Sequence, residues 1–346
     1  MQNAVITECI NDMNDSLDIV KAHVKETGNV HSLTLSDLGI ENVENKSSAD
    51  IRGELTKEDI IKALGYEPSG GNGGDGTGGG EPSNPNVTIK TFEQATDEEI
   101  IQMVQAADAG QIDLADDCGW EVGQEHMITL PAIAKSGEYD GQSWSVGEEQ
   151  PEQRVTLVLM DIGENQTFNL VSPVKDRDGN DRIKPKFIVG LKNSLSISGY
   201  IGSYAGSTAP WTASQRRKWL NAGFRQAMEA VFPNTFKQFK CITAKNQTSS
   251  ENMITDDYFS LFAEKEIAGI CDYSIPSEAN VLNQIQYYVD IDNRQKFLGN
   301  TGYLDSWWER SPKTSNNALF CYIKSDGTCS NDTLTFTKGI SPFGCI

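Results

Sequence analysis

Apolar residues recur at spacings of three and four in several stretches of the chain, which is the pattern of an amphipathic helix. The first stretch, residues 1–27, has a narrow apolar stripe between acids and lysines, so its helix needs a partner surface. A bundle of three copies and docking onto a larger assembly both satisfy that need. The second, residues 96–110, adds end signals: Thr96 as N-cap, Glu99 completing a capping box and Gly110 at the end.

The strongest helical pattern covers residues 211–232. Ser214 or Thr212 is suited to cap it, and a basic triplet occupies positions 216–218. In an acidic chain we expect this triplet to be solvated or to form internal ion pairs, not to bind nucleic acid. The predicted buried stripe consists of Trp219, Leu220, Phe224, Ala227, Met228 and Val231.

Short apolar runs between these two helices predict strands. They cover Trp120–Leu130 and Gln153–Ile162, and Lys186–Leu195 is a third strand or a strand with its turn. Together with the helices they predict one α+β domain over residues 87–346.

A glycine-rich segment precedes this domain. Residues 69–86 carry no large apolar side chain that could anchor them, so they predict a flexible linker. Before it, Leu55–Pro68 has residues suited to both caps of a short helix and a proline that prevents its continuation. We therefore divide the chain into an N-terminal helical region (1–68), a linker (69–86) and the α+β domain (87–346).

Charge and hydropathy exclude several classes of partner. The chain of 346 residues has a formal net charge of −20, and such a field repels the phosphate backbone of nucleic acids. No apolar run approaches the roughly 18 to 20 residues of a membrane span. The first residues also lack the basic and apolar regions of a secretory signal, so we expect folding in the cytosol of the producing cell, without membrane insertion.

The cysteines follow no metal or disulfide spacing. In a reducing compartment, an odd number of scattered cysteines predicts free thiols that pack as small apolar groups, rather than disulfides or a zinc site. The seven are Cys9, Cys118, Cys241, Cys271, Cys321, Cys329 and Cys345.

Motifs for catalysis and metal binding are missing. Of three histidines only His126 lies in the domain, without a G-x-S-x-G elbow, an H-E-x-x-H or C-x-x-C motif, or a phosphate-binding loop. Asp176–Asp181 resembles the start of a calcium loop but lacks the distal glutamate, so we interpret it as a turn, with calcium as the alternative. Glu264 and Glu266, in a predicted strand or turn, we interpret as structural groups that hold loops to the Arg310 region, not as an acid/base pair. We expect no cofactor.

The last stretch, residues 306–346, combines two kinds of sequence. Aromatic and apolar brackets, Trp307-Trp308 and Pro342-Phe343, enclose a segment dominated by Asn, Ser and Thr. The brackets predict buried rings, whereas short polar side chains in loops offer adaptable hydrogen bonds. The pattern favours a scaffold that displays a polar surface, and an ordinary surface loop between two strands is the alternative.

The same stretch carries a family resemblance. The phrases W-W-E-R-S-P (Trp307–Pro312), F-C-Y-I-K-S-D-G (Phe320–Gly327) and I-S-P-F-G-C-I (Ile340–Ile346) resemble the C-terminal signature of bacteriophage and prophage tail proteins. The phrases at residues 35–50 and 55–68 resemble repeats that recur in tail fibres.

Two further motifs extend the resemblance into the domain. The pattern W-x-x-S-x-x-R-x-W-x-N, which starts at Trp211, is similar to the main helix of the family. The phrase D-x-F-x-L-x-x-E-x-E matches at Phe259, Leu261 and the two glutamates that follow them. Where the family opens with W-x-V-G-D, this chain has Gln124 in place of the acid, which weakens any role for that carboxylate.

The resemblance implies a C-type-lectin-like fold, related to the formylglycine-generating-enzyme fold, and receptor binding rather than catalysis. Some relatives are variable proteins of diversity-generating retroelements, whose residues between the brackets change. It further implies a virion tail protein that is assembled in the bacterial cytoplasm, attaches to other tail or baseplate proteins through residues 1–68, and forms a homotrimer. Its expected partner is a glycan or protein on the bacterial surface.

The predicted ligand-binding residues lie in the polar segment and in its aromatic support, with Phe320 as a further platform residue. They are Trp307, Trp308, Lys313, Thr314, Ser315, Asn316, Asn317, Tyr322, Ser325, Asp326, Thr328, Ser330, Asn331, Asp332, Thr333 and Thr335. Two alternatives stay open: a virion structural or decoration protein without an external ligand, and an enzyme of the same fold that oxidises cysteine through Cys321, Cys329 or Cys345.

Overall fold

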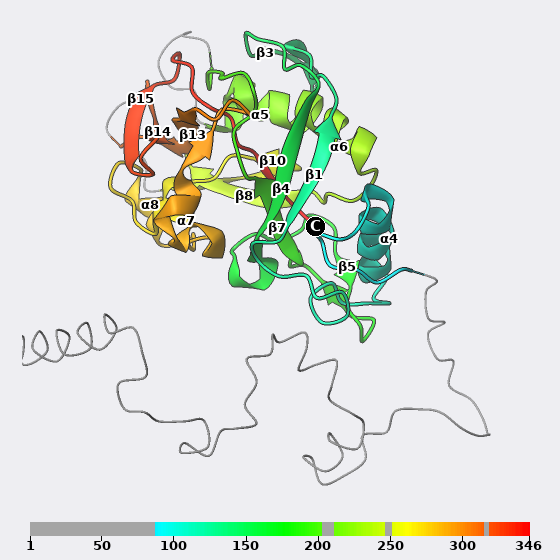
Figure 1. Cartoon of the computed structure of the whole chain (residues 1–346). Coiled ribbons are helices and arrows are strands. Elements are labelled where there is room, and N and C mark those ends of the chain that lie inside the picture. The colour runs from blue at the N-terminus through cyan, green and yellow to red at the C-terminus, as the bar shows by residue number, and fades with distance from the viewer. Residues whose placement is uncertain (1–86, 203–210, 246–250, 315–317) are drawn as a thin grey trace, which may run out of the picture. The chain divides into compact units, whose positions relative to one another are not determined.

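The computed structural model describes four parts of the chain, residues 87–202, 211–245, 251–314 and 318–346 (Figure 1). Within them, helices and several small antiparallel sheets form a mixed α+β structure, which confirms the predicted class.

Three predictions fall outside the described residues. They are the amphipathic helix over 1–27, the capped helix at 55–68 and the linker at 69–86. The division of the chain into three regions therefore stays a prediction.

A five-stranded antiparallel sheet forms the centre of the domain (Figure 1). The strand β16, at the carboxyl end of the chain, lies between two strands from earlier in the sequence. Phe343 of β16 pairs with Gly190, and Gly344 pairs with Phe259. In spatial order the strands are β1 (Glu125–Leu130), β4 (Gln153–Ile162), β7 (Phe187–Leu191), β16 (Phe343–Cys345) and β10 (Phe259–Ser260).

Alternation along the strands divides the core into two clusters. Neighbouring side chains of a strand point to opposite faces, so Leu157 and Val158 of β4 belong to different buried clusters. The cluster of Leu157 also contains residues of the helices, whereas that of Val158 contains Phe343, Trp307 and residues of β8. The sheet is thus covered on both faces.

Helix α4 (Asp97–Asp108) begins as the sequence predicts. Thr96 accepts a hydrogen bond from the Glu99 amide, and the Glu99 side chain accepts one from the Thr96 amide, so the capping box is confirmed. Gly110, with φ of +71°, lies just beyond the end.

The predicted helix at 211–232 is interrupted. Trp211–Ala213 is a 3-10 turn, and Ser214 caps α5 (Gln215–Trp219) by accepting from the Arg217 amide. A π-helical turn, Leu220–Phe224, then leads into α6 (Arg225–Val231). The predicted stripe is buried except Val231, which is half-buried.

Asn221 gives the physical reason for the interruption. Its amide donates to the carbonyls of Arg217 and Phe259, both at 3.0 Å, and its oxygen accepts from the Tyr258 amide at 2.6 Å. A polar side chain that bonds a neighbouring strand competes with the regular hydrogen bonds of a helix, and π-turns are commonly found at such places.

The strand predicted at Trp120–Leu130 is shorter than expected. It begins at Glu125 because Gly119 and Gly123 turn the chain with φ of +65° and +95°. Gln124, which replaces the family's acid, accepts from the Phe92 amide and donates to the Gly119 carbonyl, so it stabilises this turn. The strand at Gln153–Ile162 is confirmed, and the third begins at Phe187.

Small elements surround the sheet. Four two-stranded hairpins are present in the described residues: β2 (Ser136–Tyr139) with β3 (Gln142–Ser145), β5 (Val174–Lys175) with β6 (Asp181–Arg182), β8 (Phe239–Ala244) with β9 (Asn252–Asp257), and β11 (Lys296–Phe297) with β12 (Leu304–Asp305). The short helical segments are η1 (Gly163–Asn165), α7 (Glu264–Ala268), α8 (Pro276–Ala279), η4 (Gln286–Val289) and η5 (Ile291–Arg294).

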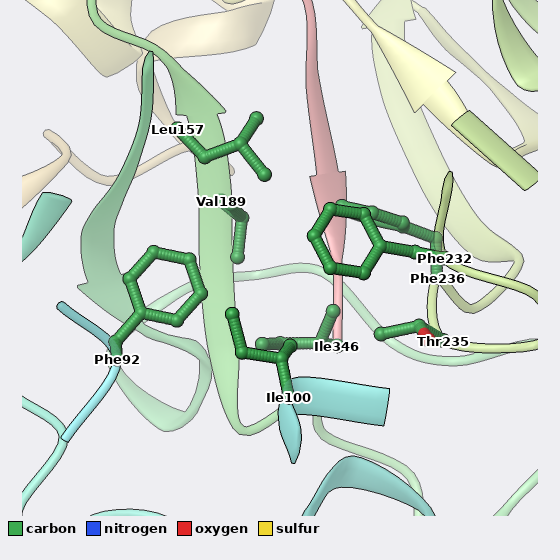
Figure 2. Close-up of a pocket in the computed structure, with 8 residues that line it drawn as sticks. All are labelled: Phe92, Ile100, Leu157, Val189, Phe232, Thr235, Phe236 and Ile346. Carbon is green, nitrogen blue, oxygen red and sulfur yellow. The ribbon is translucent and has the colours of Figure 1, made fainter. Parts of the chain in front are cut away.

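A void lies where the last residue joins the core (Figure 2). Its volume is about 10 Å³, and Thr235 is the one polar residue among the eight that line it. Ile346 points into this space together with Ile100 of α4 and Leu157 and Val189 of the sheet. A space of this size is close to that of one water molecule, so it is a packing defect and not a ligand site.

Candidate functional site

Strand β13 (Trp307–Pro312), which carries the first aromatic bracket, is buried along its whole length. Its two tryptophans point to opposite faces: Trp307 belongs to the cluster of Val158, and Trp308 to that of the helices. Each indole N–H donates to a carbonyl at 2.9 Å, from Trp307 to Arg294 and from Trp308 to Gly199. The strand is therefore held by both hydrophobic clusters.

Both tryptophans have no exposed surface. A ligand from solvent cannot contact them in this conformation, so their predicted place among the ligand-binding residues is corrected. Their position is that of a support for the strand that follows.

Arg310, on the same strand, forms a buried ion pair with Glu266. Two guanidinium nitrogens lie 2.6 Å from the two carboxylate oxygens, and both side chains are almost completely buried. The guanidinium also donates to the carbonyls of Leu261 and Ile242. This bidentate pair confirms the prediction that Glu266 holds its loop to the Arg310 region.

Glu264 has the same structural role. Its carboxylate accepts from the amides of Tyr273 and Ser274, the latter at 2.7 Å, and its own amide donates to Ser311. The two glutamates lie in helix α7 and not in the predicted strand or turn, because the Glu266 side chain closes the first turn by accepting from the Ala263 amide.

Glu309 lies beside these groups without a partner. Neither of its carboxylate oxygens has a hydrogen-bond partner among the described residues, and the side chain is completely buried. Burial, and then the charges of Glu264 and Glu278, raise the pKa of Glu309 well above its ordinary value. Both effects favour the protonated form of this carboxyl group in the folded chain.

The segment between the two aromatic brackets forms the other two strands of a three-stranded sheet with β13. β14 (Leu319–Ile323) pairs with β13 on one side and with β15 (Cys329–Thr333) on the other. β15 is the edge strand of this sheet, and all five of its residues are half-buried. The polar residues of the bracketed segment thus line an accessible edge.

The structure separates the predicted ligand-binding residues into two ends of this hairpin. Ser325, Asp326 and Thr328 form the turn between β14 and β15, where Asp326 accepts from the Thr328 amide and hydroxyl. Lys313 and Thr314 lie at the opposite end of β14. The five residues of β14 separate the two ends, and the four steps between them span about 13 Å.

The end at Lys313 is attached to the loop between α7 and α8. The Lys313 amide donates to the Leu319 carbonyl, and the Thr314 amide donates to the Tyr273 carbonyl at 2.9 Å. Both side chains are half-buried. The next predicted residues, Ser315, Asn316 and Asn317, lie outside the described residues.

Between the two ends, the strand pairing fixes which residues share a face. Tyr322 lies opposite Ser330, and Phe320 opposite Asp332, so these four side chains lie on one face of the sheet. Phe320 is buried, as expected of a platform residue. Asn331 lies opposite Cys321, and Thr333 opposite Leu319, on the other face. Thr335 follows in an exposed turn.

Lys338 was not predicted to belong to this surface. Its ammonium lies 3.8 Å from the centre of the Tyr322 ring and 2.8 Å from the Asp332 carboxylate. It thereby fixes the ring and the acid of one face. The sequence gives little indication of these contacts, because Lys338 follows β15 after a turn and no sequence spacing predicts that it meets Asp332.

The thiols near this site are not activated. The cysteines of the described residues are free, which confirms the prediction for all but Cys9. Burial is the main cause that raises the pKa values of Cys321, Cys329 and Cys345 above the ordinary value of a thiol. A reactive cysteine requires the opposite shift.

Other candidate chemistry is accounted for by local structure. His126 makes a 2.7 Å contact with Asp97 at the start of α4. Asp176 accepts from the amides of Asp178 and Asn180 in the β5–β6 turn, which confirms the interpretation of that segment as a turn. The described part of the chain contains no group of three His, Cys, Asp or Glu side chains placed to hold a metal ion.

Two residues of the basic triplet, Arg216 and Arg217, make internal contacts, and Lys218 is half-buried. Arg217 pairs with the buried Asp257 at 2.5 Å, which confirms the prediction of an internal ion pair. Arg216 is buried over the Trp219 ring and donates to the Tyr200 carbonyl. Across the described residues, no helix is both long and apolar enough to cross a membrane.

Comparison with known proteins adds one family. A family model described as "Domain of unknown function (DUF6273)" matches residues 192–346, which is less than half of the chain. The matched part includes α5, α6 and the three-stranded sheet with its supports. None of the curated proteins matches. None of the solved structures matches either.

Proposed function

We propose that this chain is a receptor-binding protein of a bacteriophage or prophage tail, and that it binds a ligand on the bacterial surface. Its domain from residue 87 onward would have a C-type-lectin-like fold. The observation that carries the proposal is the contrast within the three-stranded sheet. β13 is fixed by Trp307, Trp308 and Arg310 in the core, whereas β15 carries half-buried polar side chains and pairs with no further strand in the described residues.

The motif positions of the family resemblance support this proposal. Ser214 caps α5, Arg217 pairs with Asp257, Trp219 donates to the Ala134 carbonyl, and Asn221 joins the helix to the chain at Phe259. A pattern whose polar positions each make a contact in the structure is stronger support than the letters alone.

The binding surface we propose consists of β15 and the turns at its two ends. Ser330 and Asn331 are half-buried and Thr335 is exposed, and their side chains make no hydrogen bond within the described part of the chain, so they are suited to contact a ligand. Rigid support with free polar groups lowers the entropic cost of binding.

Catalysis by the cysteines has less support than binding. A thiol that attacks a disulfide or oxygen must reach its thiolate form, and the raised pKa values of Cys321 and Cys329 oppose this. We accordingly propose a function without enzymatic activity or cofactor. Assembly into a virion tail, a homotrimer and attachment through residues 1–68 belong to the same proposal.

The test uses the full chain and bacterial cells. We expect Ser330→Ala, Asn331→Ala and Thr335→Ala, combined, to weaken binding of the labelled chain to cells at least tenfold, about 1.4 kcal/mol. The matched control, Gln142→Ala with Ser143→Ala, changes exposed polar residues of the β2–β3 hairpin and should bind normally. Equal binding by both variants refutes the proposed surface, and lack of binding by the wild type to any bacterium tested refutes the function.

A further inference from the structure

An exposed segment of alternating apolar and acidic residues lies beside the β14–β15 turn. Residues 289–292 read Val-Asp-Ile-Asp, and all four are exposed, with 65% of Val289 and 48% of Ile291 accessible. The backbone of Asp290 is extended, with φ of −75° and ψ of 122°. Two large aliphatic side chains exposed so close together, beside the turn of the proposed binding surface, form a small apolar patch.

The segment and the turn form one surface. The α-carbon of Gly327 approaches Ile291 so closely that a β-carbon there would lie 3.0 Å from the Ile291 carbonyl oxygen and 3.4 Å from its side chain. Gly327 also needs its φ of +82°, which other residues rarely adopt. The turn residues of the proposed binding surface, Asp326 and Thr328, are thereby held next to Ile291.

The charges of this surface are mostly negative. Asp290, Asp292 and Asp326 are exposed, and Lys324 is the exposed cation beside them in the turn. Asp290 is fixed because it accepts from the Asp292 amide, whereas the Asp292 side chain makes no hydrogen bond within the described part of the chain. The remaining nearby cation, Arg294, is only half exposed and donates to the Tyr288 carbonyl.

We propose that this surface, residues 289–292 with the turn 324–328, binds a protein whose contact region carries an apolar side chain flanked by lysine or arginine. The inference rests on the proposed receptor-binding function and names the class of receptor. Apolar centres with a charged rim are the usual composition of protein interfaces, and the carboxylates complement a basic partner.

Two other ligands, a sugar and a second copy of this chain, fit the proposed surface less well. A sugar ring commonly stacks on a planar aromatic face, and residues 289–292 and 324–328 contain no aromatic side chain. A second copy of this chain would bring the same three carboxylates against this surface, and like charges repel. Both remain distinguishable outcomes of the experiment.

A stable protein interface takes about 800 Å² from each partner, which is more than two side chains provide. The next hairpin along the chain, β11–β12, supplies further apolar area. Phe297 and Leu304 lie directly opposite each other, so they share a face, and 41% and 47% of their surfaces are exposed. This exposed pair lies a few residues beyond Ile291 along the chain and adds apolar surface on the same part of the sequence.

The experiment measures binding of the full chain to bacterial cells that the wild type binds, treated either with proteinase K or with periodate. We expect proteinase K to abolish binding and periodate to leave it unchanged. Val289→Ala with Ile291→Ala should weaken binding at least tenfold, and Ile254→Ala, an equally exposed residue on β9, should not. Asp292→Asn should reduce the dependence of binding on salt concentration.

Three results would overturn the inference. They are loss of binding after periodate treatment alone, wild-type binding by the Val289 and Ile291 variant, and a change in oligomeric state of that variant by light scattering without a change in cell binding. In each case the Ser330, Asn331 and Thr335 variant can still lose binding, so the proposed function survives the failure of this inference.

Discussion

The two largest sheets of the described residues, the five-stranded and the three-stranded sheet, are stabilised by different means. The five-stranded sheet is buried by aliphatic and aromatic side chains that alternate between two clusters, as Leu157 and Val158 do. The three-stranded sheet adds buried charged groups to its apolar contacts: Arg310 pairs with Glu266, and the Glu309 carboxylate has no hydrogen-bond partner among the described residues. The first arrangement tolerates substitutions that conserve volume, whereas the second depends on individual hydrogen bonds.

The difference is informative about function. A buried polar network costs more to break than an apolar contact of the same size, so it fixes one geometry. In this chain that network lies directly behind the strands that carry the proposed binding surface. We infer that the polar core of β13 serves to hold β14 and β15 in one position.

The largest effect is expected from Arg310→Met. It leaves Glu266 buried without a cation, and the free energy of unfolding should fall by about 3–5 kcal/mol. Lys175→Met, which removes the exposed ion pair with Asp181, is the matched control and should cost about 0–1 kcal/mol. Chemical denaturation of both variants measures the contrast, and equal losses would mean that the buried pair has no special role.

In the five-stranded sheet we expect a smaller loss from Ile346→Ala. The substitution enlarges the void between α4 and the sheet, and such changes cost about 2–5 kcal/mol. Because the contact is apolar, the loss should be the same at pH 5 and pH 8. A strong pH dependence of this loss would contradict the assignment of the two kinds of core.

Glu309→Gln should raise stability in a manner that depends on pH. Because its pKa is raised by burial, Glu309 keeps its proton to a higher pH in the folded chain than in the unfolded chain, where the ordinary pKa is 4.5. The unfolded state therefore binds fewer protons above that pH, and wild-type stability falls relative to the variant by up to about 1.4 kcal/mol per pH unit. Urea denaturation between pH 4 and pH 8 measures the difference, and a constant difference would disprove a protonated Glu309.

For Lys296 we expect the opposite pH dependence of stability, at higher pH. Burial lowers its pKa from 10.5 to about 7, and its ammonium donates to the carbonyls of Leu191 and Lys192. Between pH 7 and 10.5 the unfolded chain binds more protons, so wild-type stability rises with pH relative to Lys296→Met. Of the four substitutions, Lys296→Met should change the stability at pH 7 the least. It removes the cost of burying the ammonium group, but it also removes two hydrogen bonds, and the two effects offset each other. A difference that does not change from pH 7 to pH 10 would contradict this shift.

Helix α4 and part of the five-stranded sheet were predictable because their sequence signals are local. The capping box at Thr96 and the apolar run Gln153–Ile162 need no information from the rest of the chain, and both are confirmed. The π-turn at Asn221 was not predictable, because it depends on a hydrogen bond to Phe259, which is distant in sequence. The late start of β1 was missed because the sequence does not show that Gly119 and Gly123 adopt positive φ.

The site was predictable only in part. The brackets and Arg310 stood out in the sequence, and the link from Glu266 to Arg310 followed from their types. The separation of Lys313 from Ser325 by the length of β14 depends on the strand register, which the pattern did not reveal. The contact of Gly327 with Ile291 joins two segments whose nearness no spacing indicates.

Hydrogen exchange of the full chain, free and bound to bacterial envelope vesicles, tests the central claim most directly. We predict that binding slows exchange in peptides from residues 286–292 and 318–337, while β2 and β3 exchange as in the free chain. Protection of β2 and β3 with unchanged exchange at β15 would contradict the account.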